Sequence, residues 1–491
     1  MRNKARRRLD RVGASLLARA GLRPSTHALL HSVKAKTERL LDRAARVLDR
    51  IQDAVRRRPA GDRARLLELV ELKRRNVAHY EACLRNPRFD RFPASPLEMW
   101  LEVSNACNMR CAMCADFGPD DTQSSIFRDP HPGVVGDDVR CAIVPAFAGL
   151  VALHCHGFGE PLLYGGLAEL VEEAKAHAVY TDFFTNGMRL GAELAERFVR
   201  CGLDRITVSM NGTTSEQYMM VHTGGRFELV CENLARLRDL KVQYRTDKPA
   251  LNLQVLAIGP IFETLPDTVR LAADLGTEGI ALNAMSIYET HARVHHWHMT
   301  YRPERDDRVL DECARLAARY GIAFNADAYR ASRNTPEGRP TPGPETQKTL
   351  DLGAPDSEAA PPSLYDERGR HRDVTYWDEL DEVPVEQESA GGACCVYPFK
   401  GIFVKRNGDV KACCFAHGPV FGNVLNTPVL DIWRGAGYAR LRHDLVAHRY
   451  PKDCLFCLDH RSIVTRDNAT AQQMCNIAAW VRQRVRADGG R

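Results

Sequence analysis

Hydrophobic positions near the start of the chain recur at the spacing of an α-helix. Steps of three and four residues place a first set on one helix face: Leu41, Ala44, Leu48, Ile51 and Val55. Pro59 and Gly61 interrupt this pattern, and a second apolar face follows: Leu66, Val70, Val77, Tyr80 and Leu84. The pattern predicts a helical N-terminal segment over residues 1–95, folded as a hairpin or small cap.

From residue 96 the pattern changes to short apolar runs separated by amphipathic stretches. The runs predicted as strands cover residues 97–103, 150–155, 180–184, 205–210, 250–258 and 279–287. Residues 167–177 and 227–240 show helical periodicity. Strands that alternate with helices predict an α/β fold with a parallel sheet. Six such units over residues 96–325 predict a partial (β/α)6 TIM-like barrel, with chemistry at the C-terminal ends of its strands.

The last third of the chain has a different composition. Residues 326–392 are rich in Pro, Gly, Ser and charged residues, and we expect a flexible linker or a substrate-covering insertion there. Apolar residues return in residues 393–462, where Asn407-Gly408 predicts a hairpin turn between two strands. We expect a small cysteine-rich α+β domain in this region, followed by a helical tail over residues 463–491.

Composition narrows the class of protein. Hydrophobic residues make up 44% of the 491 residues, and no apolar run approaches the roughly 20 residues of a membrane span. We recognise no export signal and expect a cytoplasmic protein. The net charge is +5, and the basic runs at residues 1–11 and 56–58 suit either a nucleic-acid or membrane contact or a solvated helix face.

Sixteen cysteines, several of them in C-x-x-C spacing, favour metal or cluster ligation over disulfides in a chain without an export signal. Cys107, Cys111 and Cys114 form a C-x3-C-x2-C motif directly after an expected strand. Three thiolates suit iron-sulfur or zinc, but a structural zinc ion normally takes four protein ligands. Three cysteines around a 4Fe-4S cluster leave one iron open to bind another ligand.

This motif resembles the signature of the radical S-adenosylmethionine superfamily, in which a hydrophobic residue, here Met113, precedes the last cysteine. The resemblance covers roughly residues 97–290, because further family signatures follow in order at later strand ends. The residues that it implies for binding S-adenosylmethionine are Met113, Gly159, Glu160, Pro161, Thr185, Asn186, Ser209 and Asn211.

The resemblance gives these residues separate roles. The glycine loop, residues 157–162, lets backbone approach the ligand, and Glu160 is expected to accept from the ammonium of the methionine part. Ser209 and Asn211 are expected near the ribose and carboxylate. Asn211 stands where the family usually has Asp, so an acceptor is kept while a charge is lost.

The family chemistry implied is reductive cleavage of S-adenosylmethionine, with one electron from the 4Fe-4S cluster, to a 5′-deoxyadenosyl radical. That radical would abstract a hydrogen atom from a small molecule or a peptide side chain, for oxidation or rearrangement. An electron donor such as flavodoxin or ferredoxin is the expected partner, and nucleic acid is not. Neither the substrate nor a catalytic acid or base is indicated. The alternatives are a non-catalytic cluster scaffold and an RNA-modifying enzyme that uses the basic N-terminus.

Four cysteines near the C-terminus form a second candidate site: Cys395, Cys413, Cys454 and Cys457. This region resembles the SPASM or twitch domains that follow many radical S-adenosylmethionine cores, which implies one auxiliary 4Fe-4S cluster. Cys414 adjoins Cys413 and leaves that ligand ambiguous. Structural zinc is the alternative, because four cysteines satisfy it equally well.

A few other residues are candidates with weaker support. His154 and His156 share one strand face and suit either substrate positioning or a packed, hydrogen-bonded pair. Asn283 and Tyr288 near the last expected strand are candidates to face substrate. The isolated cysteines are expected to be buried, inert thiols: Cys155, Cys201, Cys231 and Cys313.

Overall fold

The computed structural model describes residues 41, 44–52, 60–85, 95–114, 117–118, 131–285, 294, 296–299, 301–333, 397–413 and 420–446. Its strands are β1 (Glu98–Leu101), β2 (Ala152–His154), β3 (Tyr180–Thr185), β4 (Arg205–Ser209), β5 (Ala250–Ala257), β6 (Gly279–Ala284), β7 (Ala323–Phe324), β8 (Gly401–Val404), β9 (Asp409–Lys411) and β10 (Val420–Asn423).

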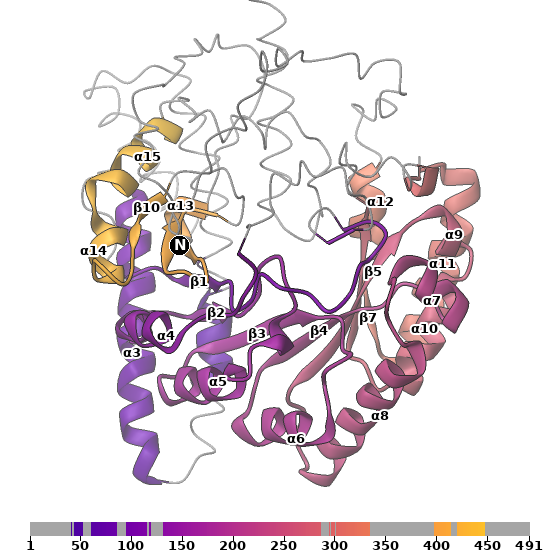
Figure 1. Cartoon of the computed structure of the whole chain (residues 1–491), viewed down its shortest axis with the longest axis horizontal. Coiled ribbons are helices and arrows are strands. Elements are labelled where there is room, and N and C mark those ends of the chain that lie inside the picture. The colour runs from indigo at the N-terminus through magenta and orange to yellow at the C-terminus, as the bar shows by residue number, and fades with distance from the viewer. Residues whose placement is uncertain are drawn as a thin grey trace, which may run out of the picture.

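Within the described residues these strands form a single sheet in the order β10-β9-β8-β1-β2-β3-β4-β5-β6-β7. From β1 to β7 every neighbouring pair is parallel, and consecutive strands lie side by side. Figure 1 shows the helices along the outer side of this curved sheet. The predicted α/β partial barrel is therefore confirmed, with the six expected strands followed by the short β7.

Helices connect and cover the strands. Their bounds are α3 (Ala60–Arg85), α4 (Asp137–Ile143), α5 (Leu167–Ala176), α6 (Ala192–Cys201), α7 (Ser215–Val221), α8 (Phe227–Gln243), α9 (Gly259–Phe262), α10 (Leu265–Asp274), α11 (Pro303–Tyr320), α12 (Ala326–Arg333), α13 (Tyr397–Lys400), α14 (Val429–Arg434) and α15 (Ala436–Val446). Short 3-10 turns include Val144–Ala146 and Pro161–Leu163. A membrane-spanning helix is not found among the described residues.

The two faces of the sheet differ in polarity. On the outer face, Phe183 of β3 packs against Phe198 of α6, with ring centroids 5.3 Å apart. Asp182 faces the opposite way, because side chains alternate along a strand. It lies in register with His154 and Arg205 on the neighbouring strands and contacts both. The inner face of the barrel therefore carries charged groups that pair with one another.

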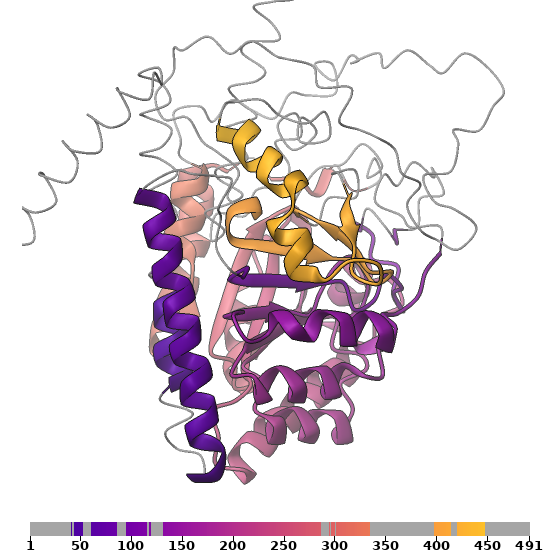
Figure 2. The same cartoon turned by 90° about the vertical axis from the view of Figure 1, so that its left-hand side faces the viewer.

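The C-terminal segment continues this same sheet. β8 pairs in parallel with β1, and β9 and β10 follow as antiparallel strands. Lys400 Nζ lies 2.7 Å from Glu98 Oε2, and Figure 2 shows the orange and yellow elements continuing from the first barrel strand. Gly408, with φ +89°, turns the chain between β8 and β9, as Asn407-Gly408 predicted. The small domain thus extends the barrel sheet through β1.

The N-terminal segment packs on the barrel through α3. Val70 and Tyr80 are buried, and Lys73 Nζ donates to the carbonyl of Phe147 at 2.6 Å. Residues 44–52 are also helical. The expected linker begins later than residue 326, because Ala326 and Tyr329 are buried and residues 326–333 form α12. The remainder of the expected linker and the expected tail over 463–491 lie outside the described residues.

Candidate functional site

The cysteine loop, residues 107–114, leaves the end of β1 and is fastened to the end of α7. The backbone N–H of Arg110 donates to the carbonyl of Thr223, and that of Ala112 donates to the carbonyl of Val221, both at 2.9 Å. Cys114 N–H donates to the carbonyl of Cys111 at 3.0 Å. The loop therefore has a fixed backbone, and α7 delivers its last residues next to the cysteines.

The three thiols of this loop lie close enough for their charges to interact. Burial raises the pKa of Cys111, and the neighbouring Cys114 and Cys107 raise it further. Among the described residues no group of three or more His, Cys, Asp or Glu side chains is arranged to hold a metal ion. Three thiols on one loop that influence one another suit the three-cysteine ligation of an iron-sulfur cluster.

The glycine loop is pinned against the segment that precedes Cys107. Glu160 N–H donates to the carbonyl of Ala106 at 2.8 Å, and Gly159 N–H donates to that of Ser104 at 3.2 Å. A Cβ on Gly159 would lie 2.4 Å from the Ala106 oxygen and 2.6 Å from the Ser104 oxygen. Glycine is thus required here because this chain's own backbone approaches it, a reason that the sequence alone did not reveal.

Glu160 joins the glycine loop to the end of β3. Its Oε1 accepts from the Thr185 hydroxyl at 2.6 Å and from Leu162 N–H at 3.0 Å, while Oε2 accepts from Asn186 N–H at 2.8 Å. Burial raises the pKa of Glu160, and these hydrogen bonds oppose the effect of burial. The carboxylate therefore connects the loop after β2 to the end of β3 through hydrogen bonds.

The side chain of Asn186 reaches from β3 back to the cysteine loop. Its Nδ2 donates to Asn108 Oδ1 at 2.9 Å, and its Oδ1 accepts from Met188 N–H at 3.0 Å. Gly187 follows with φ +75°, a conformation that favours glycine. The Thr185-Asn186-Gly187 turn thus contacts the cysteine motif itself.

Asn211, after β4, forms a second link to the cysteines. Its Oδ1 accepts from Leu256 N–H at 2.7 Å, and its Nδ2 lies 3.0 Å from His222 Nε2. The other ring nitrogen of His222, Nδ1, lies 3.4 Å from Cys111 Sγ. Both Asn211 and His222 are buried, and burial lowers the pKa of His222 to about 4. Asn211 and His222 therefore link the end of β4 to the cysteine loop.

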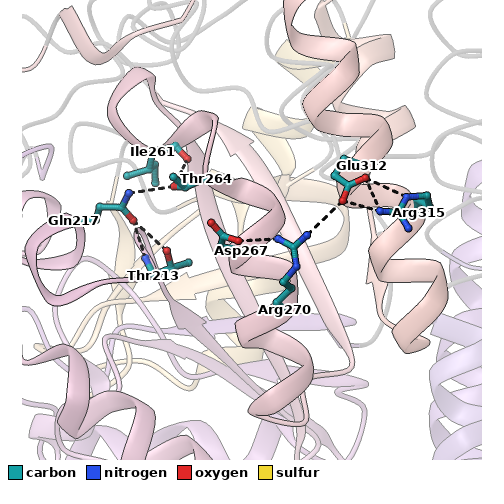
Figure 3. Close-up of polar contacts among 8 residues, drawn as sticks. All are labelled: Thr213, Gln217, Ile261, Thr264, Asp267, Arg270, Glu312 and Arg315. Atoms are coloured by element: carbon teal, nitrogen blue, oxygen red, sulfur yellow. Dashed lines mark hydrogen bonds and ion pairs between the residues drawn. The ribbon is translucent and has the colours of Figure 1, made fainter.

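The turn that carries Asn211 is held by Gln217 of α7. Gln217 Oε1 accepts from Thr213 N–H at 3.0 Å, and Gln217 Nε2 donates to Thr264 Oγ1 at 3.3 Å (Figure 3). Gly212 has φ +118°, and a Cβ there would lie 2.7 Å from Gln217 Cβ. This turn therefore tolerates only glycine at 212.

Tyr218 offers a separate observation about what completes the site. Its side chain is fully buried, and its hydroxyl has no hydrogen-bond partner among the described residues. Burial raises the pKa of Tyr218, and the charge of Cys111 raises it further, so the two groups lie near each other. Buried hydroxyls are normally hydrogen-bonded. An orphaned hydroxyl whose pKa responds to the charge of Cys111 fits a site that a cluster and its ligand complete.

The other candidates fall at or near the strand ends. Pro161 is buried, whereas Met113 and Ser209 are half-buried and Ser209 pairs in register with Gln254. Asn283 is buried on β6, and Tyr288 lies outside the described residues. The sequence did not reveal four residues of this site: Asn108, Gln217, Tyr218 and His222. Asn108 occupies a variable position of the cysteine motif, and the other three lie outside any recognisable motif.

His154 ends β2 and His156 follows it, and the two histidines have different surroundings. His154 Nδ1 lies 2.6 Å from Asp182 Oδ1, and the His154 ring stacks on Trp100 with centroids 4.9 Å apart. His156 Nδ1 is buried without a hydrogen-bond partner in the described part of the chain, and burial lowers its pKa to about 4. His154 is thus the packed, hydrogen-bonded histidine, while His156 keeps an unused nitrogen.

The isolated cysteines differ in burial, and only two of the four expected to be buried are so. Cys155 and Cys313 are buried, and burial raises the pKa of Cys313 to about 12. Cys201 and Cys231 are half-buried, and burial raises the pKa of Cys231 to about 11. In the second candidate site Cys413 is half-buried after β9. The other residues of that site, Cys395, Cys414, Cys454 and Cys457, lie outside the described residues.

Two family descriptions match parts of the chain. Residues 101–251 match the radical SAM superfamily, and residues 394–458 match the SPASM iron-sulfur cluster-binding domain. The first match contains the cysteine, glycine, Thr-Asn-Gly and Ser209 segments, and the second contains all four C-terminal candidate cysteines. These matches confirm the expected cofactors, S-adenosylmethionine and iron-sulfur clusters.

Individual proteins are similar over shorter stretches. The tungsten-containing aldehyde ferredoxin oxidoreductase cofactor-modifying protein of Pyrococcus furiosus is 22% identical over 185 residues, 38% of this chain and 50% of that protein. The mycofactocin maturase MftC of Mycobacterium tuberculosis is 28% identical over 151 residues, 30% of this chain and 36% of MftC. The chain thus matches about half or less of the length of these relatives.

Among solved structures, Streptococcus suis SuiB aligns with a TM-score of 0.47 and 12% identity, covering 74% of this chain and 71% of SuiB. The family matches are the stronger result, because they contain the residues that the structure brings together around the cysteine loop. The chain carries a radical SAM domain followed by a C-terminal SPASM iron-sulfur cluster-binding domain.

Proposed function

We propose that this protein is an enzyme that reductively cleaves S-adenosylmethionine to a 5′-deoxyadenosyl radical, which abstracts a hydrogen atom from its substrate. The observation that carries the proposal is the convergence of three strand ends on the cysteine loop. Glu160 follows β2, Asn186 follows β3 and Asn211 follows β4, and each connects to the cysteine loop or to the residues flanking it. Active sites of such barrels lie at this end of the strands.

The chain's own part in this chemistry is to hold the cluster and S-adenosylmethionine in position. Cys107, Cys111 and Cys114 would hold a 4Fe-4S cluster, which supplies one electron when bound. The Glu160 carboxylate already accepts from the Thr185 hydroxyl and from Asn186 N–H. Its remaining lone pairs would accept from the ammonium of S-adenosylmethionine. Ser209 at the end of β4 would contact the ribose. A reductant such as flavodoxin or ferredoxin would deliver the electron.

The inner face of the barrel is the proposed substrate site. His156 contributes a buried ring nitrogen without a partner among the described residues, which a substrate hydroxyl or amide could satisfy. Its ring packs edge-on against Phe184 of β3, with centroids 4.8 Å apart. A small molecule or a peptide side chain, oxidised or rearranged after hydrogen abstraction, suits a site of this mixed character.

The second proposed site is an auxiliary 4Fe-4S cluster held by Cys395, Cys413, Cys454 and Cys457. It would accept an electron from a substrate radical or help to bind substrate. After anaerobic reconstitution we expect roughly eight iron atoms per chain, two 4Fe-4S clusters. Cys413→Ser and Cys414→Ser identify the ligand, because only the variant of the true ligand loses iron. Roughly four iron atoms per chain, with bound zinc, would instead support the structural-zinc alternative.

The test of the radical reaction is anaerobic incubation with S-adenosylmethionine and dithionite. We expect 5′-deoxyadenosine from the wild-type protein and from Cys141→Ser, which changes an exposed cysteine of α4. We expect none from Cys111→Ser. Absence of 5′-deoxyadenosine from wild type with an intact cluster would contradict the proposal and leave the scaffold interpretation.

The substrate class needs its own experiment. Extracts of cells grown in deuterated medium, separated into small-molecule and peptide fractions, are added to the same reaction. The fraction that contains the substrate will transfer deuterium to 5′-deoxyadenosine, because the radical takes its hydrogen from the substrate. His156→Phe is expected to lose this transfer while still forming unlabelled 5′-deoxyadenosine without substrate.

A further inference from the structure

The hydrogen bonds around His222 fix which of its ring nitrogens carries the proton. Leu256 N–H can only donate, so the Asn211 atom that it meets at 2.7 Å is the amide oxygen. The other atom of that amide is then the NH2 group, which donates to His222 Nε2 at 3.0 Å. A neutral imidazole that accepts at Nε2 carries its proton on Nδ1.

The protonated nitrogen faces the cysteine loop. Nδ1 of His222 lies 3.4 Å from Sγ of Cys111, within hydrogen-bonding distance for sulfur. The ring is held by tilted packing against Tyr218, with centroids 4.5 Å apart, and by the backbone bonds from Arg110 and Ala112 to the residues on either side of it. His222 is 1% exposed, so water does not compete for this contact.

We propose that His222 is a positioning residue that donates a neutral N–H to the thiolate of Cys111 and thereby raises the reduction potential of the bound cluster, with Asn211 holding the required tautomer. This inference rests on the proposed function only in assuming that Cys111 is a cluster ligand. Hydrogen bonds to ligand sulfurs withdraw negative charge, which favours the cluster form that has gained one electron.

This role also explains why Asn stands at position 211, where the family usually has Asp. A carboxylate cannot donate a hydrogen bond. An Asp at 211 would therefore accept one from a proton on His222 Nε2, either in the other neutral tautomer or in the positively charged ring. In the first case the Nδ1 lone pair would face the thiolate, and in the second a full charge would lie beside it. Asn delivers a directed hydrogen bond without either consequence.

The test compares two variants of His222 in the full-length, reconstituted protein without S-adenosylmethionine. His222→Asn places an amide N–H near the position of Nδ1, whereas His222→Leu fills similar volume without a donor. Redox titration followed by electron paramagnetic resonance measures the reduction potential of the cluster held by Cys107, Cys111 and Cys114. For His222→Leu we expect the equilibrium constant for reduction to fall about tenfold, or about 59 mV for a one-electron couple. His222→Asn should stay near wild type.

A second readout detects the bond itself. In D2O, pulsed electron paramagnetic resonance should show an exchangeable deuteron coupled to the reduced cluster in wild type and His222→Asn, and its loss in His222→Leu. If His222→Leu takes up no iron, the Asn211→Leu variant is measured instead. The reduction potential of its cluster should fall, because both tautomers of His222 become accessible.

The outcomes separate this inference from the proposed function. Wild-type protein without a reducible cluster overturns both. A wild-type cluster whose potential and deuteron signal are the same in His222→Leu overturns this inference alone. An equal fall in His222→Leu and His222→Asn, with full iron content in both, also overturns it, because a donor at that position would then make no difference.

Discussion

The Nδ2 group of Asn186 donates to Oδ1 of Asn108 at 2.9 Å, joining the end of β3 to the middle of the cysteine motif. Asn108 lies between Cys107 and Met109, and the Met109 side chain is buried. This single bond connects a turn expected near S-adenosylmethionine to the loop expected to hold the cluster. It offers a direct way to loosen the loop without changing a cysteine.

We expect Asn108→Ala and Asn186→Ala each to speed the removal of iron by a chelator. Loss of one such hydrogen bond typically costs about 1 kcal/mol, which is several-fold in a rate or equilibrium. The double variant should lose iron hardly faster than the faster single variant, because both changes remove the same bond. Iron release followed by absorbance measures this, and fully additive effects would show that the two residues act separately.

Gly159→Ala should displace the glycine loop from the cysteine loop. The new methyl group would meet the Ala106 and Ser104 oxygens, and such overpacking typically costs about 1–3 kcal/mol. The matched control is Gly191→Ala, because a Cβ there meets nothing within 4 Å and the backbone φ is −68°. We expect urea unfolding and iron content to change for Gly159→Ala and to stay near wild type for Gly191→Ala. Equal behaviour of the two variants would contradict this explanation.

Acid stability should depend on Asp182. Burial alone would raise the pKa of Asp182, but the adjacent His154 and Arg205 outweigh burial and hold it well below its ordinary value. A carboxyl whose pKa is lower in the folded state stabilises the fold above its unfolded pKa of about 3.9, and this contribution is lost as the pH falls below that value.

Asp182→Asn removes this carboxylate and leaves Arg205 unpaired on the inner face. At pH 7 we expect a loss of about 3–5 kcal/mol in the free energy of unfolding, since a buried ion pair is broken. The difference in the free energy of unfolding between Asp182→Asn and wild type should become smaller below about pH 4. Urea unfolding at several pH values measures it, and a difference that is independent of pH would show that Asp182 acts through packing alone.

Tyr218→Phe tests the orphaned hydroxyl. In the cluster-free protein we expect the variant to be more stable than wild type by about 1 kcal/mol, because a buried hydroxyl without a partner is removed. In the reconstituted protein that gain should disappear, because the hydroxyl then has a partner. Thermal unfolding of both forms provides the comparison, and the same gain in both would place the hydroxyl away from the cofactors.

Local patterns in the sequence predicted much of this fold, and the reasons for the misses are physical. β5 alternates partly buried and fully buried positions along its length, as period-two patterning requires, so its place was visible in the sequence. β8 pairs with β1 across some 300 residues of chain, and no local pattern specifies such a register. The C-terminal region therefore looked separate although it extends the sheet.

The site shows the same division. The cysteines, Glu160 and Asn211 lie in contiguous motifs and were found from them. His222 is a lone histidine at the end of α7, and only the backbone bonds between its neighbours and the cysteine loop bring it to Cys111. Gly159 was expected to make room for a ligand, whereas the space beside it is filled by Ala106.

The most direct test of the account is the effect of S-adenosylmethionine on the electron paramagnetic resonance spectrum of the cluster held by Cys107, Cys111 and Cys114. A cluster with three cysteine ligands has one iron open to the methionine part, so adding S-adenosylmethionine to the reduced protein should change the signal, and Cys111→Ser should abolish both signal and change. A reduced-cluster spectrum that is identical with and without S-adenosylmethionine would contradict the account.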